Sequence, residues 1–205
     1  MSHEIIKAAF WDAINQVASN ISQYTFHLGQ DLIRARKLGP DKLLTFLVSC
    51  SSSSTRIELL DFFGLRKDSP SASAFNQQRA KLMPEALEAV FYRFNSSLPS
   101  AGAPFPRFLA TDGSTFTFFS RPAFFSSEYF VSVGHSAKGF YSMHLNALYD
   151  LQKHTYSDAL IQPVHQKDEF RAFCNMVDRH STLQGVRDVF IGDRGYWPIT
   201  TWLMS

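Results

Sequence analysis

Apolar residues recur every three to four positions along the first hundred residues, the spacing of one face of a helix. The clearest series comprises Ile6, Phe10, Ala13, Ile14, Val17 and Ile21. Shorter series predict helices opening at Pro40, running from about Thr55 to Phe63 and from Ser71 to Leu82, and opening at Pro84. In the helix near Thr55, the residues expected to face inward are Ile57, Leu60 and Phe63, and Gly64 is placed to end it.

Beyond Pro106 the apolar period changes to two, which is typical of strands. Strands are predicted at Phe108–Asp112, with the alternating piece Thr115–Phe118 after it, and at Met143–Leu151, Tyr156–Pro163 and Val189–Ile191, with a helix around Phe170–Val177. The strand Met143–Leu151 is expected to be half-buried, with one face formed by Met143, Leu145, Ala147, Tyr149 and Leu151. Its other face would carry His144, Asn146 and Asp150, the last two as hydrogen-bonding groups. The continuously apolar run Val189–Ile191 indicates a central parallel strand.

The segment from Ser96 to Pro106 holds small and polar residues with three prolines, and is the best candidate for a domain boundary. It separates a helical region, residues 1–100, from residues 101–205, so the fold class is α+β. The order strand, strand, strand, helix, strand in the second part is that of the first half of an RNase H-like α/β core. In that topology the first and fourth strands are neighbours.

Two aspartates, Asp112 and Asp193, each end an apolar, strand-like run. A carboxylate at a strand end can face a cleft while the strand behind it stays buried. If the two strands are adjacent, the aspartates direct two hard oxygen ligands at one point, which suits Mg²⁺ or Mn²⁺. For Asp112, which precedes Gly113 and Ser114, a turn is the alternative interpretation.

Positive charge is concentrated in one stretch of a chain whose formal net charge is only +2. Between Arg34 and Lys81, nine basic residues face four acidic ones. This excess predicts a polyanionic partner, DNA above all, or a solvated helical surface as the alternative. The helices near residues 55–63 and 71–82 fit either a helix-turn-helix, which would present Gln77 and Lys81 to DNA, or an ordinary helical pair.

Two further features bear on the cellular compartment. No apolar run approaches the ~18 residues that span a bilayer, and the start of the sequence lacks a signal-peptide layout. Cys50 and Cys174 lie in apolar patterns without metal-type spacing. We therefore expect buried free thiols in a reducing cytoplasm, and no membrane partner.

Several ordered motifs together resemble the DDE transposases of bacterial insertion sequences, in the insertion sequence four family. They are Leu109-Ala110-Thr111-Asp112-Gly113-Ser114, the run from His144 to Leu151, Ile161-Gln162-Pro163, and Gly192-Asp193-Arg194-Gly195-Tyr196. Upstream, Arg36-Lys37-Leu38 and the run from Pro70 to Leu82 are similar to the helical region of the same proteins. The likeness covers most of residues 30 to 198.

The resemblance implies cut-and-paste DNA transposition, with Asp112 and Asp193 as the first and second metal-binding aspartates. Two Mg²⁺ (or Mn²⁺) ions would occupy the complete site, and the partners would be the transposon's terminal inverted repeats and target DNA. Arg194 and Tyr196 would contact DNA phosphate or simply anchor their loop. The other candidate DNA contacts are Arg36, Lys37, Gln77, Arg79 and Lys81.

The family's catalytic glutamate belongs to a segment beyond the second aspartate that this sequence does not contain. We therefore expect an amino-terminal fragment or truncated reading frame that is inactive alone. Apolar surface near Trp197 and Trp202 would favour self-association. Glu169 as a substitute third carboxylate is one alternative, although helix capping explains it more simply. The rival function is a non-catalytic DNA-binding or dimerising fragment that inhibits a full-length relative.

Overall fold

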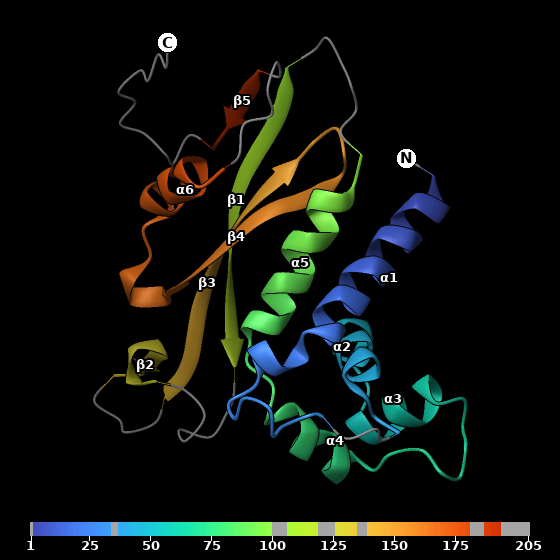
Figure 1. Cartoon of the computed structure of the whole chain (residues 1–205). Coiled ribbons are helices and arrows are strands. Elements are labelled where there is room, and N and C mark those ends of the chain that lie inside the picture. Colours follow the sequence, from blue (N-terminus) through green and yellow to red (C-terminus); the bar gives the residue numbers. More distant parts are fainter. Residues whose placement is uncertain are drawn as a thin grey trace. The chain divides into compact units, whose positions relative to one another are not determined.

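In the described part of the chain, five α-helices precede a mixed five-stranded sheet that carries one further helix (Figure 1). The computed structural model describes residues 2–33, 37–99, 106–118, 126–134, 139–180 and 187–193. The chain divides into two compact units, Met1–Pro99 and Ser100–Ser205, which we call the helical unit and the sheet unit.

The helices of the helical unit follow the three-to-four spacing of its apolar residues. They are α1 (His3–Ser19), α2 (Pro40–Ser49), α3 (Thr55–Phe62), α4 (Ala72–Arg79) and α5 (Glu85–Ser97), with a 3₁₀ turn, η1 (Ile21–Tyr24), after α1. Pro40 begins α2 at the first helical position, where its missing N–H costs no hydrogen bond. The side chain of Ser71 caps α4 by accepting the N–H of Ala74 at 3.1 Å. Gly64, with a φ of +69°, follows α3 in the left-handed conformation that ends many helices.

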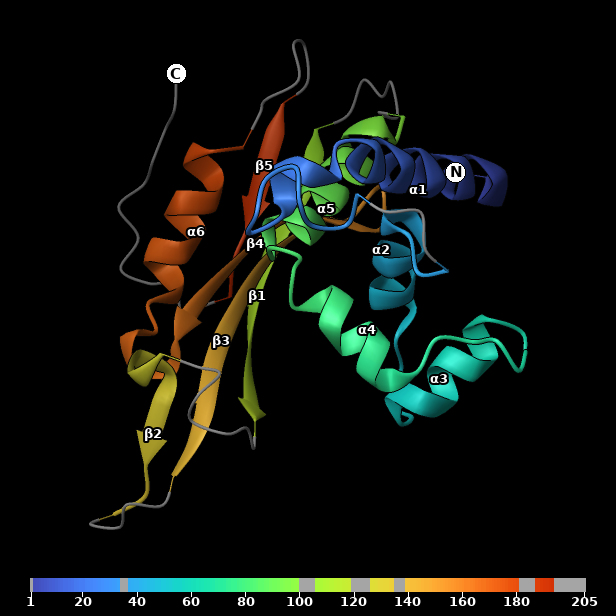
Figure 2. The same ribbon diagram turned by 60° about the horizontal axis from the view of Figure 1, so that its bottom comes forward.

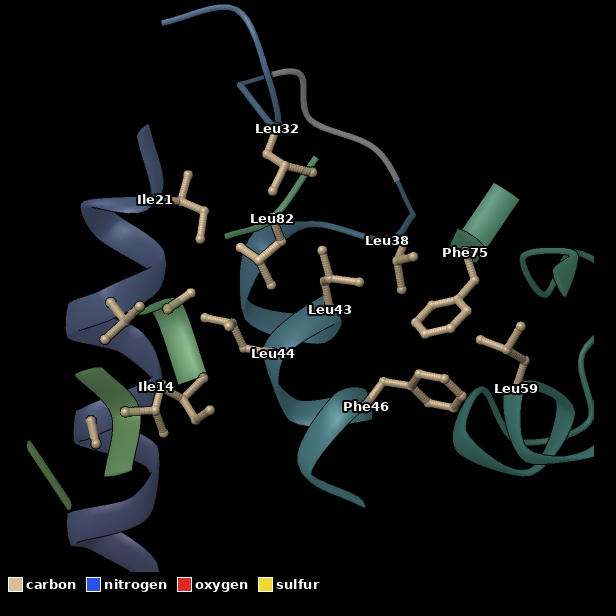
Figure 3. Close-up of a cluster of buried hydrophobic side chains, with 14 residues drawn as sticks. Ile14, Ile21, Leu32, Leu38, Leu43, Leu44, Phe46, Leu59, Phe75 and Leu82 are labelled. Carbon is tan, nitrogen blue, oxygen red and sulfur yellow. The ribbon is translucent and has the colours of Figure 1, made fainter. Parts of the chain in front are cut away.

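The core of the helical unit is apolar and aromatic. Phe46 of α2 lies between the rings of Phe62 and Phe75, with ring centroids 5.3 and 4.8 Å away in edge-to-face arrangements. Figure 3 shows Phe46, Phe75 and Leu59 directed toward one another from three different helices. On the α1 side, the buried stripe is formed by Ala9, Ala13, Ile14 and Val17.

The face of α3 that is buried differs from the predicted one. Ile57 was expected to face inward but is 52% exposed, whereas Leu59 is fully buried against the core. Apolar residues occur almost all around this two-turn helix, so their spacing does not fix its rotation. Packing against Phe46 and Phe75 decides which side is buried.

The sheet unit contains β1 (Arg107–Phe118), β2 (Phe130–Ser132), β3 (Gly139–Asp150), β4 (Thr155–Pro163), α6 (Glu169–Asp178) and β5 (Asp188–Ile191), with short 3₁₀ turns η3 (Ser127–Tyr129) and η4 (Val164–Gln166). β3 pairs antiparallel with β1 on one edge and with β2 and β4 on the other. β1 pairs in parallel with β5. Figure 2 shows β1 and β3 side by side over most of their length. Among the described strands β5 stands at the end of the order, so its predicted central position is not observed.

The prediction that Asp112 closes its strand is wrong. β1 continues to Phe118 and joins the two predicted pieces into one strand. Pairing with β3 runs without interruption from Leu109↔Asp150 to Phe118↔Tyr141, and this ladder holds β1 extended through Gly113. What ends near Asp112 is the pairing on the other edge, because β5 accompanies β1 only as far as Ala110.

The buried face of β3 is the opposite of the predicted one. His144, Asn146, Leu148 and Asp150 are buried, whereas Met143, Leu145, Ala147 and Tyr149 are half-buried. Helix α6 accounts for this difference, because its Met176 packs on Leu109 and Leu148 and covers that face. Asp150 accepts the backbone N–H groups of Gln152 and Lys153, both at 2.9 Å, and so orders the turn into β4.

A buried ion pair joins the beginnings of the two parallel strands. Arg107 of β1 binds both carboxylate oxygens of Asp188 of β5, with Nε at 2.7 Å from Oδ1 and Nη2 at 2.8 Å from Oδ2. Nη2 of Arg107 also contacts Nε2 of His180, just beyond α6. Burial, and then the nearby Arg107 charge, lower the pKa of His180 below its ordinary value of 6.5, while Asp188 opposes the shift.

The lowered pKa of His180 predicts a loss of stability in mild acid. The unfolded chain takes up a proton on this residue as the pH falls through about 6.5, whereas the folded chain resists. Unfolding is therefore favoured below that pH, by at most about 1.4 kcal/mol per pH unit for one histidine. His180→Gln should flatten the pH dependence of the free energy of unfolding between pH 6.5 and 5.5. An equal slope in His180→Gln and the wild type would contradict this, and the exposed His165→Gln serves as the control.

Two other predictions can be compared with the structure. Both cysteines are free, but Cys50 is exposed and Cys174 only half-buried, so the expectation of buried thiols is wrong. Cys50 follows α2 directly, in the serine-rich connection to α3. Every helix within the described residues is too short or too polar to cross a lipid bilayer.

Candidate functional site

The parallel pairing of β1 with β5 makes neighbours of the two segments that carry the candidate aspartates. Ala110 of β1 is the partner of Ile191 of β5. Asp112 and Asp193 each follow that pair by two residues in their own segment. Residues 81 positions apart in the sequence thus follow two neighbouring strands, each just beyond the last pair of the β5 ladder.

Asp112 lies on the sheet face that α6 does not cover. Its partner on β3 is Ala147, whereas Leu109 and Leu148 pack on α6 from the other face. The carboxylate of Asp112 is exposed, and its Oδ1 accepts the N–H of Gly113 at 2.8 Å. Asp193 is also exposed and directly follows Gly192. Both carboxylates are therefore accessible to a ligand from solvent.

A polar cluster occupies the opposite face, beneath the first turn of α6. His144 of β3 is 1% exposed, and its Nδ1 lies 3.0 Å from Oγ1 of Thr115 on β1. Its Nε2 lies 3.0 Å from Oε1 of Glu169, which Lys167 also approaches at 2.7 Å. The approach to Glu169 is short but not aligned as a hydrogen bond, so Nε2 has no hydrogen-bond partner among the described residues.

The surroundings of His144 disfavour the charged form of its ring. Burial, and then the charge of Lys167, lower its pKa below the ordinary value of 6.5, and the carboxylates of Glu169 and Asp112 oppose this only in part. A neutral imidazole carries one proton and one lone pair, so one ring nitrogen is free to act as a base or as a metal ligand.

The side chain of His144 leaves no room for a Cβ at position 113. A Cβ at position 113 would overlap Nε2 of His144 and lie 2.9 Å from its Cε1 and 3.3 Å from Oδ1 of Asn146. The close approach of a side chain to the backbone, and not an unusual dihedral angle, therefore explains the glycine.

Gly113→Ala is expected to lower the free energy of unfolding by about 1–3 kcal/mol, because the buried ring has to leave its position. It should also change the NMR shifts of the His144 ring. Chemical denaturation measures the first effect. Ser114→Ala is the matched control, since Ser114 is exposed on the other face of the same strand. Equal stability of the two variants would contradict the packing argument.

Glu169 does not lie beside Asp112. It begins α6 and contacts His144 and Lys167, on the face of the sheet opposite Asp112. The helix is capped by its neighbour Asp168, whose side chain accepts the N–H of Arg171 at 2.9 Å. The geometry therefore gives no support to Glu169 as a third carboxylate beside Asp112.

The candidate DNA-binding residues that can be described have partners within the helical unit. Lys37 donates to the backbone oxygen of Asp68 at 3.0 Å and lies 3.1 Å from its carboxylate, which Arg66 also contacts. The hydrogen bond from Lys37, and then the Arg66 charge, lower the pKa of Asp68. Lys81 lies 3.7 Å from Asp31.

The remaining candidates are placed as follows. Arg79 lies over the ring of Phe75 at 5.6 Å, and Gln77 is exposed on α4 with its Nε2 3.5 Å from Oγ of Ser73. The connection between α3 and α4 covers residues 63–71, longer than the three- to four-residue turn of a helix-turn-helix. Arg36, Arg194, Tyr196, Trp197 and Trp202 lie outside the described residues.

The sequence interpretation missed the buried cluster around His144. Alternation along β3 indicated two faces but not which one a helix would cover, because both carry apolar residues. The sequence did hold one signal of this cluster: a glycine, Gly113, on the strand beside the polar residues of β3.

The chain was compared with models of protein families, with curated proteins and with solved structures, and none of the three comparisons found a match.

Proposed function

We propose that this chain carries part of the core of a DDE-type DNA transposase, with Asp112 and Asp193 as ligands of Mg²⁺ or Mn²⁺. The observation that carries the proposal is the parallel pairing of β1 with β5, since each aspartate follows the pair Ala110↔Ile191 by two residues in its own segment. Both side chains are exposed. The motifs that contain them resemble those of this family in the same order along the chain.

The strand arrangement supports the same proposal. In the order β4, β3, β1, β5, the first three strands are antiparallel neighbours and β5 is parallel to β1. An RNase H-like core has this order, with the helix that we call α6 preceding the parallel strand. Such a fold would place metal-binding carboxylates at the edge where β1 and β5 diverge.

The donor set fits a hard divalent cation. Two exposed carboxylates offer up to four oxygen atoms, and Mg²⁺ commonly takes one or two carboxylates, completing its shell with water and phosphate oxygens. Among the described residues no group of three His, Cys, Asp or Glu side chains could hold a metal, so the aspartate pair would act with such outside ligands. When bound, divalent ions would activate a hydroxyl and stabilise the leaving oxygen in phosphodiester cleavage.

The helical unit would supply the contact with DNA. Its excess of basic residues between Arg34 and Lys81 suits a phosphate backbone, and Arg79 and Gln77 are exposed on α4. The ion pairs of Lys37 and Lys81 with acidic neighbours reduce the charge available to DNA. Binding through this unit should therefore be weak and strongly dependent on salt.

The test combines Mn²⁺ binding with DNA cleavage. Asp112→Asn and Asp193→Asn should each weaken Mn²⁺ binding at least about tenfold, as measured by the EPR signal of free Mn²⁺. The exposed Asp178→Asn on α6 is the control. Metal-dependent nicking of a terminal-repeat duplex, lost in both variants, would support an active enzyme. Binding of DNA and metal without nicking would indicate the non-catalytic fragment. Unchanged Mn²⁺ affinity in both variants would contradict the proposal.

A further inference from the structure

Three buried polar atoms gather between β1 and β3 on the face beneath α6. Oγ1 of Thr111, Nε2 of His144 and Oδ1 of Asn146 have no hydrogen-bond partner among the described residues. Thr111 and Gly113 belong to β1, and the cross-strand partner of Gly113 is Asn146. The His144 and Asn146 atoms both lie near Gly113. Buried polar atoms are nearly always satisfied, so these atoms call for a ligand, an ion or a water molecule.

The neighbours of these atoms fix the direction of two of them. The amide nitrogen of Asn146 donates to Oε1 of Gln162 at 3.2 Å and to the backbone oxygen of Leu160 at 3.4 Å. Its Oδ1 is thereby turned toward Gly113, 3.3 Å from the point that a Cβ there would occupy. The contact between Nδ1 of His144 and Oγ1 of Thr115 fits either tautomer of the ring, because the hydroxyl can donate or accept. A metal on Nε2 would select the tautomer with the proton on Nδ1, which then donates to Thr115.

Glu169 supplies the negative charge. Its Oε1 lies 3.0 Å from Nε2 of His144 without hydrogen-bond alignment. Two ligands of one transition-metal ion, each about 2.0–2.2 Å from the metal, stand roughly 3.0–3.5 Å apart with their lone pairs side by side. The contact has this spacing. Lys167 Nζ, 2.7 Å from the same oxygen, shows that a positive charge already finds a favourable place there.

We propose that His144 and Glu169, assisted by Oδ1 of Asn146, bind a divalent transition-metal ion of the Zn²⁺ type. An imidazole nitrogen with carboxylate and amide oxygens suits Zn²⁺ better than Mg²⁺, which prefers oxygen ligands alone. The site is separate from the aspartate pair, because Asp112 lies on the other face of the sheet. It joins β3 to the first turn of α6, and the ammonium of Lys167 competes with the metal for Glu169.

The experiment uses Zn²⁺ alone as the probe on the full chain. Long-range ¹H–¹⁵N NMR of the imidazole rings should show Nε2 of His144 shifting on Zn²⁺ addition while its Nδ1 stays protonated. The Asp112→Asn, Asp193→Asn double variant should show the same response, which separates this site from the proposed catalytic one. A response lost in that double variant would overturn the separate site.

Three substitutions sharpen the test. Glu169→Gln keeps the shape of a half-exposed side chain, so it should fold and weaken Zn²⁺ binding at His144 at least about tenfold. Lys167→Gln removes the competing charge and should strengthen binding by up to about fivefold. A purely structural ion pair would give no gain of Zn²⁺ affinity in Lys167→Gln. His165→Gln, an exposed histidine on the preceding turn, is the control and should leave the His144 response unchanged.

Several outcomes would overturn the proposal. One is a His144 ring that does not respond to Zn²⁺ at millimolar concentration while exposed histidines do. Another is an unchanged affinity in Glu169→Gln. A third is a nuclear Overhauser contact between the His144 ring and a bound water that persists through saturation with Zn²⁺, since this would assign the three buried atoms to water alone.

Discussion

Replacing Asp188 by alanine is expected to lower the free energy of unfolding of the sheet unit by about 3–5 kcal/mol. The loss is large because Arg107 would remain buried without its partner. Its Nε and Nη2 both donate to the Asp188 carboxylate, at 2.7 and 2.8 Å, and the aspartate side chain is only 4% exposed. Guanidinium chloride denaturation, followed by hydrogen exchange at the β1 and β3 amides, measures the effect.

Two further variants distinguish the loss of the ion pair from a general effect on stability of removing a carboxylate. Asp178→Ala removes an exposed aspartate at the end of α6, where a negative charge is unfavourable to the helix dipole, and should cost almost nothing. Arg107→Met combined with Asp188→Leu removes both charges and should recover most of the lost stability. If Asp188→Ala and Asp178→Ala unfold alike, the buried pair is not a major support of the fold.

Replacing Phe46 by alanine is expected to cost the helical unit a similar amount, about 3–5 kcal/mol. The side chain is 1% exposed and packs edge-to-face against Phe62 and Phe75, so its removal leaves a cavity between three helices. Circular dichroism during denaturation measures the loss, because the helices would unfold together.

Val48→Ala is the matched control for Phe46, since Val48 belongs to the same helix and is half exposed. It should change stability by no more than about 0.5 kcal/mol. Phe46→Leu should lie between the two, because leucine fills part of the cavity. A stability of Phe46→Ala equal to that of Val48→Ala would mean that this core does not hold the helices together.

The helices could be predicted well from spacing, but their rotation only where the apolar stripe is narrow. In α1 the stripe Ala13, Ile14 and Val17 is buried as the period of three to four requires. In α3 apolar residues lie on most sides, and contact with Phe46 selected Leu59 in place of Ile57. That contact is tertiary, so the buried face of α3 could not have been predicted from the sequence of the helix alone.

The candidate site was predictable in outline. That the strands of Asp112 and Asp193 are neighbours followed from the order of elements, and the parallel pairing of β1 with β5 confirms it. Metal binding by the two aspartates stays a prediction. The length of β1 and the burial of His144 were not predictable, because each depends on a partner: β3 extends the strand, and α6 selects the buried face.

The parallel contact between β1 and β5 also dictates an order of assembly. Chain synthesis completes β1 long before β5, so Asp188 can reach Arg107 only after the strands, helix and turns between them have been synthesised. Contacts of such long sequence separation close slowly, because the entropy of a large loop opposes them. A nascent chain that has not yet formed β5 therefore contains the strand of Asp112 without its parallel neighbour. Under the proposed function, chemistry that needs both carboxylates would be withheld until β5 has paired.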